Sequence, residues 1–343
     1  MFPKAMIRIS TSAIVLICLF VFHKDTLVSA RTYVRTRRPG LTSVRFIDNQ
    51  YGWIAGTQGV FYTDDGGWSW RRQKLVVAKE FGRSRAALVE KSGKILWADK
   101  ESALVRTDNS LAIGNGKAGP WRLVKCQTSP QLLDIAFPER DLGWAISDRG
   151  IYFSRDGGSS WELKRKSSEG LQSLCAVSAK AVWVIGFRRL MISTTDQGES
   201  WHEYLFQDRE PFYLRSVKFI DQKRGWAFKS NGPLFSSDGG VTWGAYGPPD
   251  MKATELFDVA FGNENVGWIV GDGTIFYTEN GGRNWEIKVR NIKDYMVSIS
   301  PLPNGNSWAV GAGGTVMKTS DTGKAWEYWD LRWNFRPLKG PGR

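Results

Sequence analysis

The sequence carries TDDGGWSW at residues 63–70, and the same pattern returns five times, as SRDGGSSW (154–161), TTDQGESW (194–201), SSDGGVTW (236–243), TENGGRNW (278–285) and TSDTGKAW (319–326). The shared pattern is Ser/Thr-x-Asp-x-Gly-x-x-Trp, in which an asparagine once replaces the aspartate. A seventh, degenerate copy is predicted to begin at Thr107 and Asn109 and to close at Trp121 after a glycine-rich insertion. Self-similarity at a fixed period indicates a repeat architecture.

The spacing of tryptophans sets the length of the repeat. The closing tryptophans fall at 70, 121, 161, 201, 243, 285 and 326, and a second series runs in phase with them at 53, 97, 144, 183, 226, 268 and 308. Each period holds four short apolar runs between turn residues, as in LFDVAF (256–261), GWIVG (267–271), TIFYT (274–278) and WEIKV (285–289). Seven such periods predict an all-β fold, a seven-bladed β-propeller of four-stranded antiparallel blades.

The repeated box is predicted to be a structural turn between the third and fourth strands of each blade. Its aspartate can accept hydrogen bonds from turn amides, and its glycine can adopt a positive φ at little cost. Carboxylates at regular turns of separate blades cannot converge on a substrate, and both tryptophan series are expected to pack within or between blades. The residues given this structural role are Asp65, Asp156, Asp196, Asp238, Asn280 and Asp321.

Two long cations stand out among the expected inner strands. Aligned on the mid-repeat tryptophan, the matched inner position reads Arg45, Val89, Ala136, Ala176, Lys218, Ala260 and Ser300. Small or apolar residues suit a crowded channel wall, whereas a buried cation is costly without a partner. Arg45 and Lys218 are therefore expected either to pair with Asp134 and Asp258 on nearby inner strands or to form an anion-binding channel.

A second group of basic residues falls in or near the loops where propellers usually bind partners, between second and third strands and between blades. Arg188 and Arg189 are adjacent in the segment GFRR, and arginine suits bidentate recognition of carboxylates. Ordinary solvated loop charge is the alternative. The candidate partner-binding residues are Arg45, Arg149, Arg188, Arg189, Arg215 and Lys218.

Cysteine and histidine usage predicts neither a metal site nor a cofactor. The only histidines are His23 and His202, whereas a zinc site normally needs clustered histidine or cysteine. Cys126 is expected on an outer strand of the second blade and Cys175 on an inner strand of the fourth. A disulfide needs Cα atoms closer than about 7 Å, so we expect two unbridged thiols.

The first thirty residues are predicted to direct export. The apolar run at 9–22 is shorter than the about 20 residues of a membrane span, and Val28-Ser29-Ala30 suits signal peptidase. We expect a signal peptide at 1–30, cleaved after Ala30, or an uncleaved anchor, then the propeller at 31–331 and a flexible basic tail at 332–343. The expected location is the periplasm or the extracellular space, or a lumen in a photosynthetic host.

The repeat unit resembles a known family. It pairs a Gly-Trp-x-x-Gly strand, as in GWIAG (52–56) and GWIVG (267–271), with an Asp-box some ten residues later. This unit is similar to the photosystem II assembly and stability factor family, within the wider Asp-box (BNR) propellers, and the resemblance covers residues 41–331. It implies a non-enzymatic assembly factor, because photosynthetic members bind a reaction-centre subunit through a basic patch on the propeller.

The formal net charge of +13 favours an acidic partner, although it also suits simple solubility. The first hypothesis is therefore an exported, monomeric scaffold that binds an acidic or membrane-associated protein through a basic propeller face; export argues against nucleic acid. One alternative is a lectin-like propeller for envelope polysaccharide, with Trp68, Trp329 and Trp333 exposed. The other is a sialidase-like glycoside hydrolase, although the expected inner strands lack its three arginines and its tyrosine–glutamate pair.

Overall fold

A computed structural model describes residues 40–73, 94–100, 102–106, 111–115, 121–124, 132–206, 214–229, 232–245, 251 and 255–330. The predicted export segment, the predicted basic tail, Cys126 and Trp333 lie outside these residues. Within them, no helix has the length and apolar character needed to cross a membrane.

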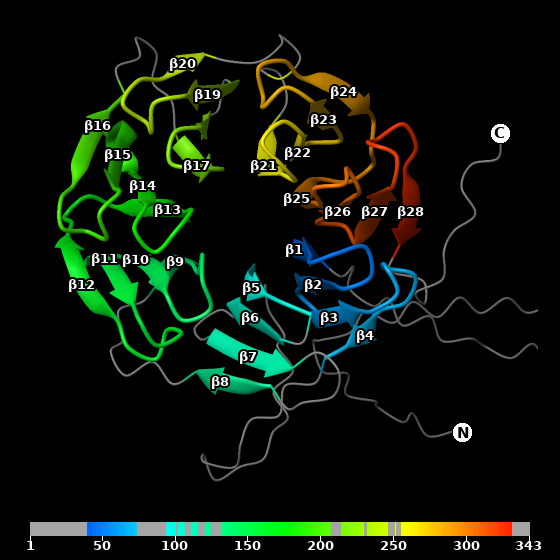
Figure 1. The fold of residues 1–343 in the computed structure, drawn as a ribbon, viewed down its shortest axis with the longest axis horizontal. Helices are drawn as coiled ribbons and strands as arrows, with labels where there is room; N and C mark the ends of the chain where they lie inside the picture. The colour runs from blue at the N-terminus through cyan, green and yellow to red at the C-terminus, as the bar shows by residue number, and fades with distance from the viewer. Residues whose placement is uncertain are drawn as a thin grey trace, which may run out of the picture. The chain divides into compact units, whose positions relative to one another are not determined.

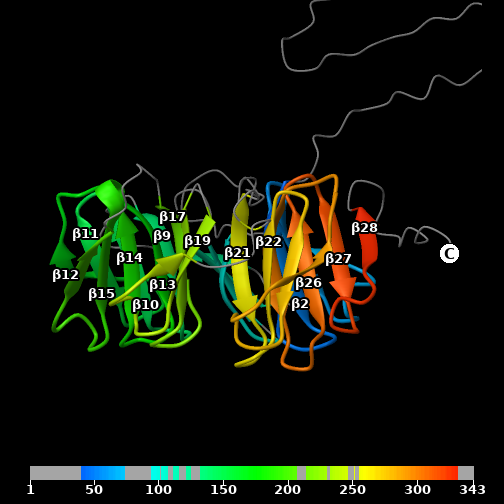
Figure 2. The same cartoon turned by 90° about the horizontal axis from the view of Figure 1, so that it is seen from above.

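The described residues form seven sheets, each of four antiparallel strands, arranged in a ring (Figure 1). The prediction of an all-β, seven-bladed propeller is confirmed. Each blade consists of four strands that are consecutive in the chain, so the first and last blades share no strand among the described residues. Figure 2 shows this ring from the side, with the strands crossing its thickness.

Each blade runs from an inner first strand to an outer fourth strand. Blades one to three contain β1 (Leu41–Phe46), β2 (Gly52–Gly56), β3 (Gly59–Thr63), β4 (Arg71–Arg72); β5 (Lys94–Ala98), β6 (Ser102–Arg106), β7 (Leu111–Asn115), β8 (Arg122–Val124); and β9 (Leu132–Ala136), β10 (Gly143–Ser147), β11 (Gly150–Ser154), β12 (Glu162–Lys166). Blades four and five contain β13 (Leu171–Ala176), β14 (Val182–Gly186), the 3₁₀ turn η1 (Phe187–Arg189), β15 (Leu190–Thr194), β16 (His202–Leu205); and β17 (Leu214–Phe219), β18 (Gly225–Lys229), β19 (Gly232–Ser236), β20 (Gly244–Ala245). Blades six and seven contain β21 (Leu256–Phe261), β22 (Gly267–Gly271), β23 (Ile275–Thr278), β24 (Glu286–Val289); and β25 (Met296–Pro301), β26 (Ser307–Gly311), β27 (Thr315–Thr319), β28 (Glu327–Asp330).

Blade two departs from the predicted repeat. Its third strand, β7, lies between Asn109 and Trp121 in the sequence, so the degenerate box with a glycine-rich insertion is wrong: the supposed insertion contains a strand. The inner strand is β5, which contains Trp97, and not the segment around Val89. Trp97 is only half-buried and does not lie on a second strand, so its place in the second tryptophan series is also wrong.

The strand register corrects two positions of the inner-strand alignment. Arg45 pairs with Trp53, the residue after the first glycine of β2. The equivalent position in blade two is Ala98 rather than Val89, because Ala98 pairs with the second residue of β6. In blade four it is Cys175, which pairs with Trp183, rather than Ala176. Cys175 is a free thiol on the inner strand of blade four, where the sequence placed it.

The mid-repeat tryptophans pack successive blades together. Trp308 of blade seven stacks on Phe46 of blade one at 3.7 Å between ring centroids, and its indole donates a hydrogen bond of 3.2 Å to the carbonyl of Gly66. Trp183 repeats this arrangement between blades four and five, at 3.8 Å from Phe219. The fully buried members of the series are Trp53, Trp144, Trp183, Trp226, Trp268 and Trp308. The predicted packing within or between blades is therefore confirmed for this series. Trp97 lies on an inner strand instead of a second strand, but it too packs against the cluster that blades two and three share.

Hydrogen bonds from side chains within each Asp-box stabilise its turn. Oδ1 of Asp65 accepts hydrogen bonds from the Ser69 amide at 2.9 Å and from the Thr63 hydroxyl at 2.7 Å, while the Ser69 hydroxyl donates to Oδ2. The Thr63 hydroxyl in turn accepts the amide of Gly67, which adopts a φ of 93°. The other box residues accept the amide four positions later in the same way: Asp156, Asp196, Asp238, Asn280 and Asp321. Each box carboxylate thus faces its own turn.

Candidate functional site

The inner strands surround a central channel that contains a cavity of about 600 Å³. Three cations line this cavity from three different blades: Arg45 on β1, Lys94 on β5 and Lys218 on β17. The structure therefore brings together the two channel cations that the sequence singled out. Lys94 was missed because the segment around Val89 was taken for the inner strand of blade two.

Side chains on the inner strands join neighbouring blades across the channel wall. The free edge of an inner strand would leave backbone amides unpaired, and a serine or aspartate on the preceding blade accepts them. The donor and acceptor pairs are Val44 N with Ser298 Oγ, Ile95 N with Ser43 Oγ, Leu174 N with Asp134 Oδ2 and Ile299 N with Asp258 Oδ2. We call these contacts the inter-blade clasps. The two channel aspartates thus replace serine as clasp acceptors.

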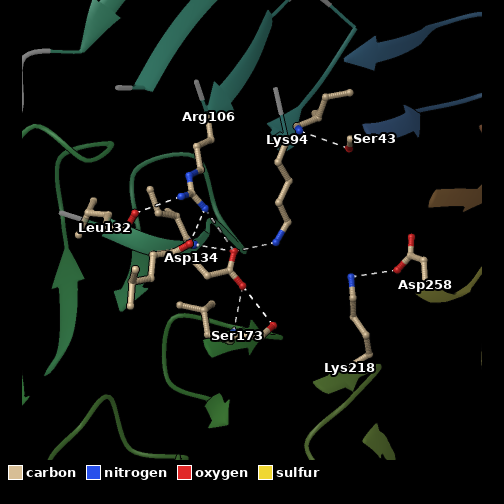
Figure 3. A network of polar contacts seen from close by, with 12 residues as sticks. Ser43, Lys94, Arg106, Leu132, Asp134, Ser173, Lys218 and Asp258 are labelled. Atoms are coloured by element: carbon tan, nitrogen blue, oxygen red, sulfur yellow. Dashed lines mark hydrogen bonds and ion pairs between the residues drawn. The ribbon is translucent and has the colours of Figure 1, made fainter. Parts of the chain in front are cut away.

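Asp134 is a buried carboxylate that is held by a lysine of the preceding blade (Figure 3). Lys94 Nζ lies 2.9 Å from Oδ1, and Oδ2 accepts the Ser173 hydroxyl at 3.2 Å in addition to its clasp amide. The cations beside Asp134 are therefore Lys94 and, at 3.9 Å from Oδ1, Arg106 of the same blade as Lys94. Arg45, the partner that one sequence hypothesis allowed, does not contact it. Burial acts to raise the pKa of Asp134, but the charge of Lys94 and the hydrogen bonds outweigh it and lower the pKa below its ordinary value.

Lys218 and Asp258 form the matching pair between blades five and six, with Nζ 3.1 Å from Oδ1, as the sequence hypothesis of pairing expected. The charge of Asp258 raises the pKa of Lys218 above its ordinary value despite the burial of the lysine. Both lysine–aspartate pairs cross seams at which the inner strands approach each other less closely than at the other five. Figure 3 shows Lys94 and Lys218 reaching into the same central space from opposite sides.

Arg45 differs from both lysines. Its side chain is open to the channel, and it has no ion pair or hydrogen bond with any residue that the structure describes. Burial within the channel lowers the pKa of Arg45, yet a guanidinium keeps its charge in proteins. The channel wall therefore carries one positive charge that no described side chain balances.

Two other predicted residues lie on one face of the ring. This face carries the connections between second and third strands, including residues 148–149 and 187–189, and we call it the arginine face. Arg149 is exposed between β10 and β11. Arg188 lies in η1 of the next blade, with its side chain 83% exposed and Nη1 3.8 Å from Glu169. The side chains of Arg189 and Arg215 are outside the described part of the structure.

A groove of about 370 Å³ lies beside Arg188, between blades three and four. Its walls combine polar and apolar side chains: Arg165, Lys166, Glu169, Arg188, Leu190 and Leu205. Arg188 adopts φ 56° and ψ 28°, a left-handed conformation that is uncommon outside glycine. The neighbouring Phe187 is 51% exposed. An exposed arginine in a left-handed conformation therefore lies beside an exposed aromatic ring.

Other site types receive less support. In the described ranges, no three histidine, cysteine or acidic side chains are grouped so that they could hold a metal ion. Of the aromatic residues considered for carbohydrate binding, Trp329 is 4% exposed, so its predicted exposure is wrong. Trp68 is 49% exposed and packs edge-on against Trp329.

Comparison with known proteins gives a family match. Residues 113–248 and 249–337, more than half of the chain, match the family described as photosynthesis system II assembly factor YCF48. Similar curated relatives include the photosystem II assembly lipoprotein Ycf48 of Synechococcus sp. (strain CC9902), 23% identical over 32% of this chain and 35% of that protein. The chloroplastic photosystem II stability/assembly factor HCF136 of Arabidopsis thaliana is 23% identical over 51% of this chain and 47% of that protein. The chain therefore aligns with less than half the length of each.

Solved structures share the fold. YCF48 bound to a D1 peptide superposes with a TM-score of 0.65 at 17% identity, covering 83% of this chain and 93% of that chain. A GH74 xyloglucanase from Xanthomonas campestris superposes with a TM-score of 0.61 at 12% identity, covering 85% of this chain and 54% of that chain. At these identities both comparisons show the propeller architecture alone.

Proposed function

Because this chain belongs to the YCF48 family of photosystem II assembly factors, we propose that it is a non-catalytic assembly factor that binds an acidic segment of a protein partner through its arginine face. The observation that carries the proposal is the exposed Arg188, held in a left-handed conformation next to Phe187 and the groove between blades three and four. A relative with this fold has been solved with a bound D1 peptide. Peptide binding is therefore within the capacity of such a propeller.

The contacts of Arg188 suit an exchange of partners. Its guanidinium lies 3.8 Å from the carboxylate of Glu169, and both side chains are exposed. An exposed ion pair at this distance contributes little, roughly 0–1 kcal/mol. A carboxylate of an incoming peptide could replace Glu169 at small cost and gain bidentate geometry. The exposed ring of Phe187 would supply apolar contact beside it.

Catalysis is less well supported. A glycoside hydrolase of the common two-carboxylate type needs one protonated acid and one carboxylate that faces the substrate. Both channel aspartates, Asp134 and Asp258, are instead bound to a lysine and to a backbone amide of the next blade. The lowered pKa of Asp134 keeps that group ionised near neutral pH, where it could not serve as a proton donor.

We place the site of action outside the cytoplasm. The apolar run at residues 9–22 supports export, and the two curated relatives are named a lipoprotein and a chloroplastic protein. In this proposal the protein acts as a monomer without cofactor or metal. Its partner is a membrane-associated or otherwise acidic protein rather than nucleic acid or envelope polysaccharide.

The test compares charge reversals on the two faces of the same blade. Tagged wild type, Arg188→Glu and Lys180→Glu are each incubated with envelope extract of the source cells, and recovered proteins are quantified by mass spectrometry. Lys180 is exposed in the connection between β13 and β14, on the opposite face of blade four, and undergoes the same change of charge. We expect R188E to lower recovery of the main partner about tenfold, the size of a lost charge-assisted contact, and K180E to leave it unchanged. Equal recovery by R188E and wild type would remove the arginine face from the proposal.

A further inference from the structure

The channel has unused hydrogen-bond donors on its side chains. Each channel carboxylate is occupied by a lysine and a clasp amide, and Asp134 also accepts the Ser173 hydroxyl. Each lysine carries three N–H donors, of which one is directed to its aspartate. Arg45 carries five donors and contacts no described partner. Both lysines and Arg45 therefore have unused hydrogen-bond donors, and each of these donors belongs to a cation.

The two aspartates do not cancel this charge. Asp134 is shared by Lys94 and Arg106, and Asp258 is paired with Lys218, so the charge of Arg45 is left over. A channel with low-dielectric protein walls and an excess of one sign of charge concentrates its field on a counter-ion. Lys94 and Lys218 remain 45% and 36% exposed, so both can contact a second partner without breaking their ion pairs.

We propose that the central channel binds a small multivalent oxyanion, of the phosphate or citrate type, between Arg45, Lys94 and Lys218. The cavity of about 600 Å³ falls within the range of about 300–1,000 Å³ typical of small-ligand sites. Arg45 offers the planar fork that matches two oxygens of one anion, and the lysines supply point charges to the others. The site is separate from the arginine face, so this inference does not rest on the proposed function.

Equivalent positions in other blades show which substitutions the channel wall can accept without loss of the fold. The position of Arg45 is occupied by Ala98, Ala136 and Ala260 in three other blades, so Arg45→Ala places a residue that this wall already accepts. The double variant Lys218→Ala/Asp258→Ser removes one cation and its carboxylate together. It keeps a serine clasp acceptor like Ser43 and Ser298. Arg45→Gln keeps a polar side chain that can donate hydrogen bonds and removes its charge.

The experiment is isothermal titration calorimetry of the full chain with phosphate, citrate and acetate, at constant ionic strength set with sodium chloride. We expect phosphate and citrate to bind with one site per chain and acetate to bind at least tenfold more weakly. Arg45→Ala and Arg45→Gln should each weaken binding of both multivalent anions roughly tenfold or more, and K218A/D258S severalfold. Arg149→Ala on the arginine face should match wild type.

Three results would overturn the inference. One is the absence of binding heat for both multivalent anions, and another is unchanged affinity in both Arg45 variants. The third is an equal loss of affinity in Arg149→Ala, which would indicate nonspecific attraction to the basic surface. Circular dichroism and the melting temperature of each variant verify that the ring is folded, and either Arg45 substitution alone is sufficient for the comparison.

Discussion

The first Asp-box allows a stability prediction that can be compared with another box of the same protein. Asp65 accepts three hydrogen bonds, two at Oδ1 from the Ser69 amide and the Thr63 hydroxyl, and one at Oδ2 from the Ser69 hydroxyl. At roughly 0.5–1.5 kcal/mol each, and toward the lower end for an exposed turn, Asp65→Ala should cost about 2 kcal/mol. Asn280 occupies the same position in the box of blade six and keeps both Oδ1 contacts. Asp65→Asn should therefore cost only about 0.5 kcal/mol.

The assay is urea unfolding of wild type and both variants, followed by circular dichroism, with the free energy of unfolding compared under one set of conditions. Asp64→Ala is the matched control, because Asp64 precedes the box aspartate and, among the described residues, its side chain forms one ion pair, with the exposed Arg71. Equal destabilisation by D65N and D65A would refute the division between Oδ1 and Oδ2. A D65A variant as stable as wild type would refute the structural account of the box.

Three further predictions concern the seams and the boxes. Trp308→Phe should lower the free energy of unfolding by about 1 kcal/mol more than Trp226→Phe. The reason is that Trp308 donates a hydrogen bond to the Gly66 carbonyl, whereas Trp226 Nε1 has no partner among the described residues. Equal losses in urea unfolding would mean that the hydrogen bond of Trp308 contributes nothing. Lys218→Ala should be about 1 kcal/mol less stable than Lys218→Ala/Asp258→Ser, since the single variant leaves a carboxylate without its ammonium; a more stable single variant would contradict this. Burial tends to raise the pKa of Asp65 and Asp156, but hydrogen bonds within the boxes lower both pKa values. Because the folded-state pKa lies below the unfolded value near 3.9, the boxes should stabilise the ring above about pH 4 and lose this contribution as the pH falls further; urea midpoints from pH 6 to 3 that do not decline would count against it.

The sequence was sufficient for the architecture because the repeat marks every blade twice. The box fixes the turn between third and fourth strands, and the mid-repeat tryptophan fixes the second strand. The box and the tryptophan both take part in packing between blades, since the indole of one blade donates a hydrogen bond to a box carbonyl of another blade. Both features therefore recur where blades meet. Six of the seven blades follow the pattern, and the four strands predicted for blade six were each placed within one residue.

Blade two shows where this reasoning fails. It has no box between β7 and β8, and its second strand carries Ala103 where the other blades carry tryptophan. Trp97 was therefore aligned with the second-strand tryptophans although it lies on the inner strand. As a result, Lys94 was not recognised as a channel cation. The pairing of Lys218 with Asp258 could be expected, but the pairing of Asp134 with Lys94 rather than Arg45 depends on the register of the inner strands, which the sequence does not show.

The described strands of blade one all come from the N-terminal end of the ring, and those of blade seven all come from its C-terminal end. The join between them has a clasp like those at three joins inside the chain, and stacking and an indole hydrogen bond like those between blades four and five. A circularly permuted gene that opens between blades three and four, where a clasp and an indole hydrogen bond also join the blades, should therefore encode the same ring. Because the first and last blades are joined by contacts that also occur inside the chain, duplication or loss of one 40-residue unit would change the circumference of the ring without requiring a new kind of contact between its ends.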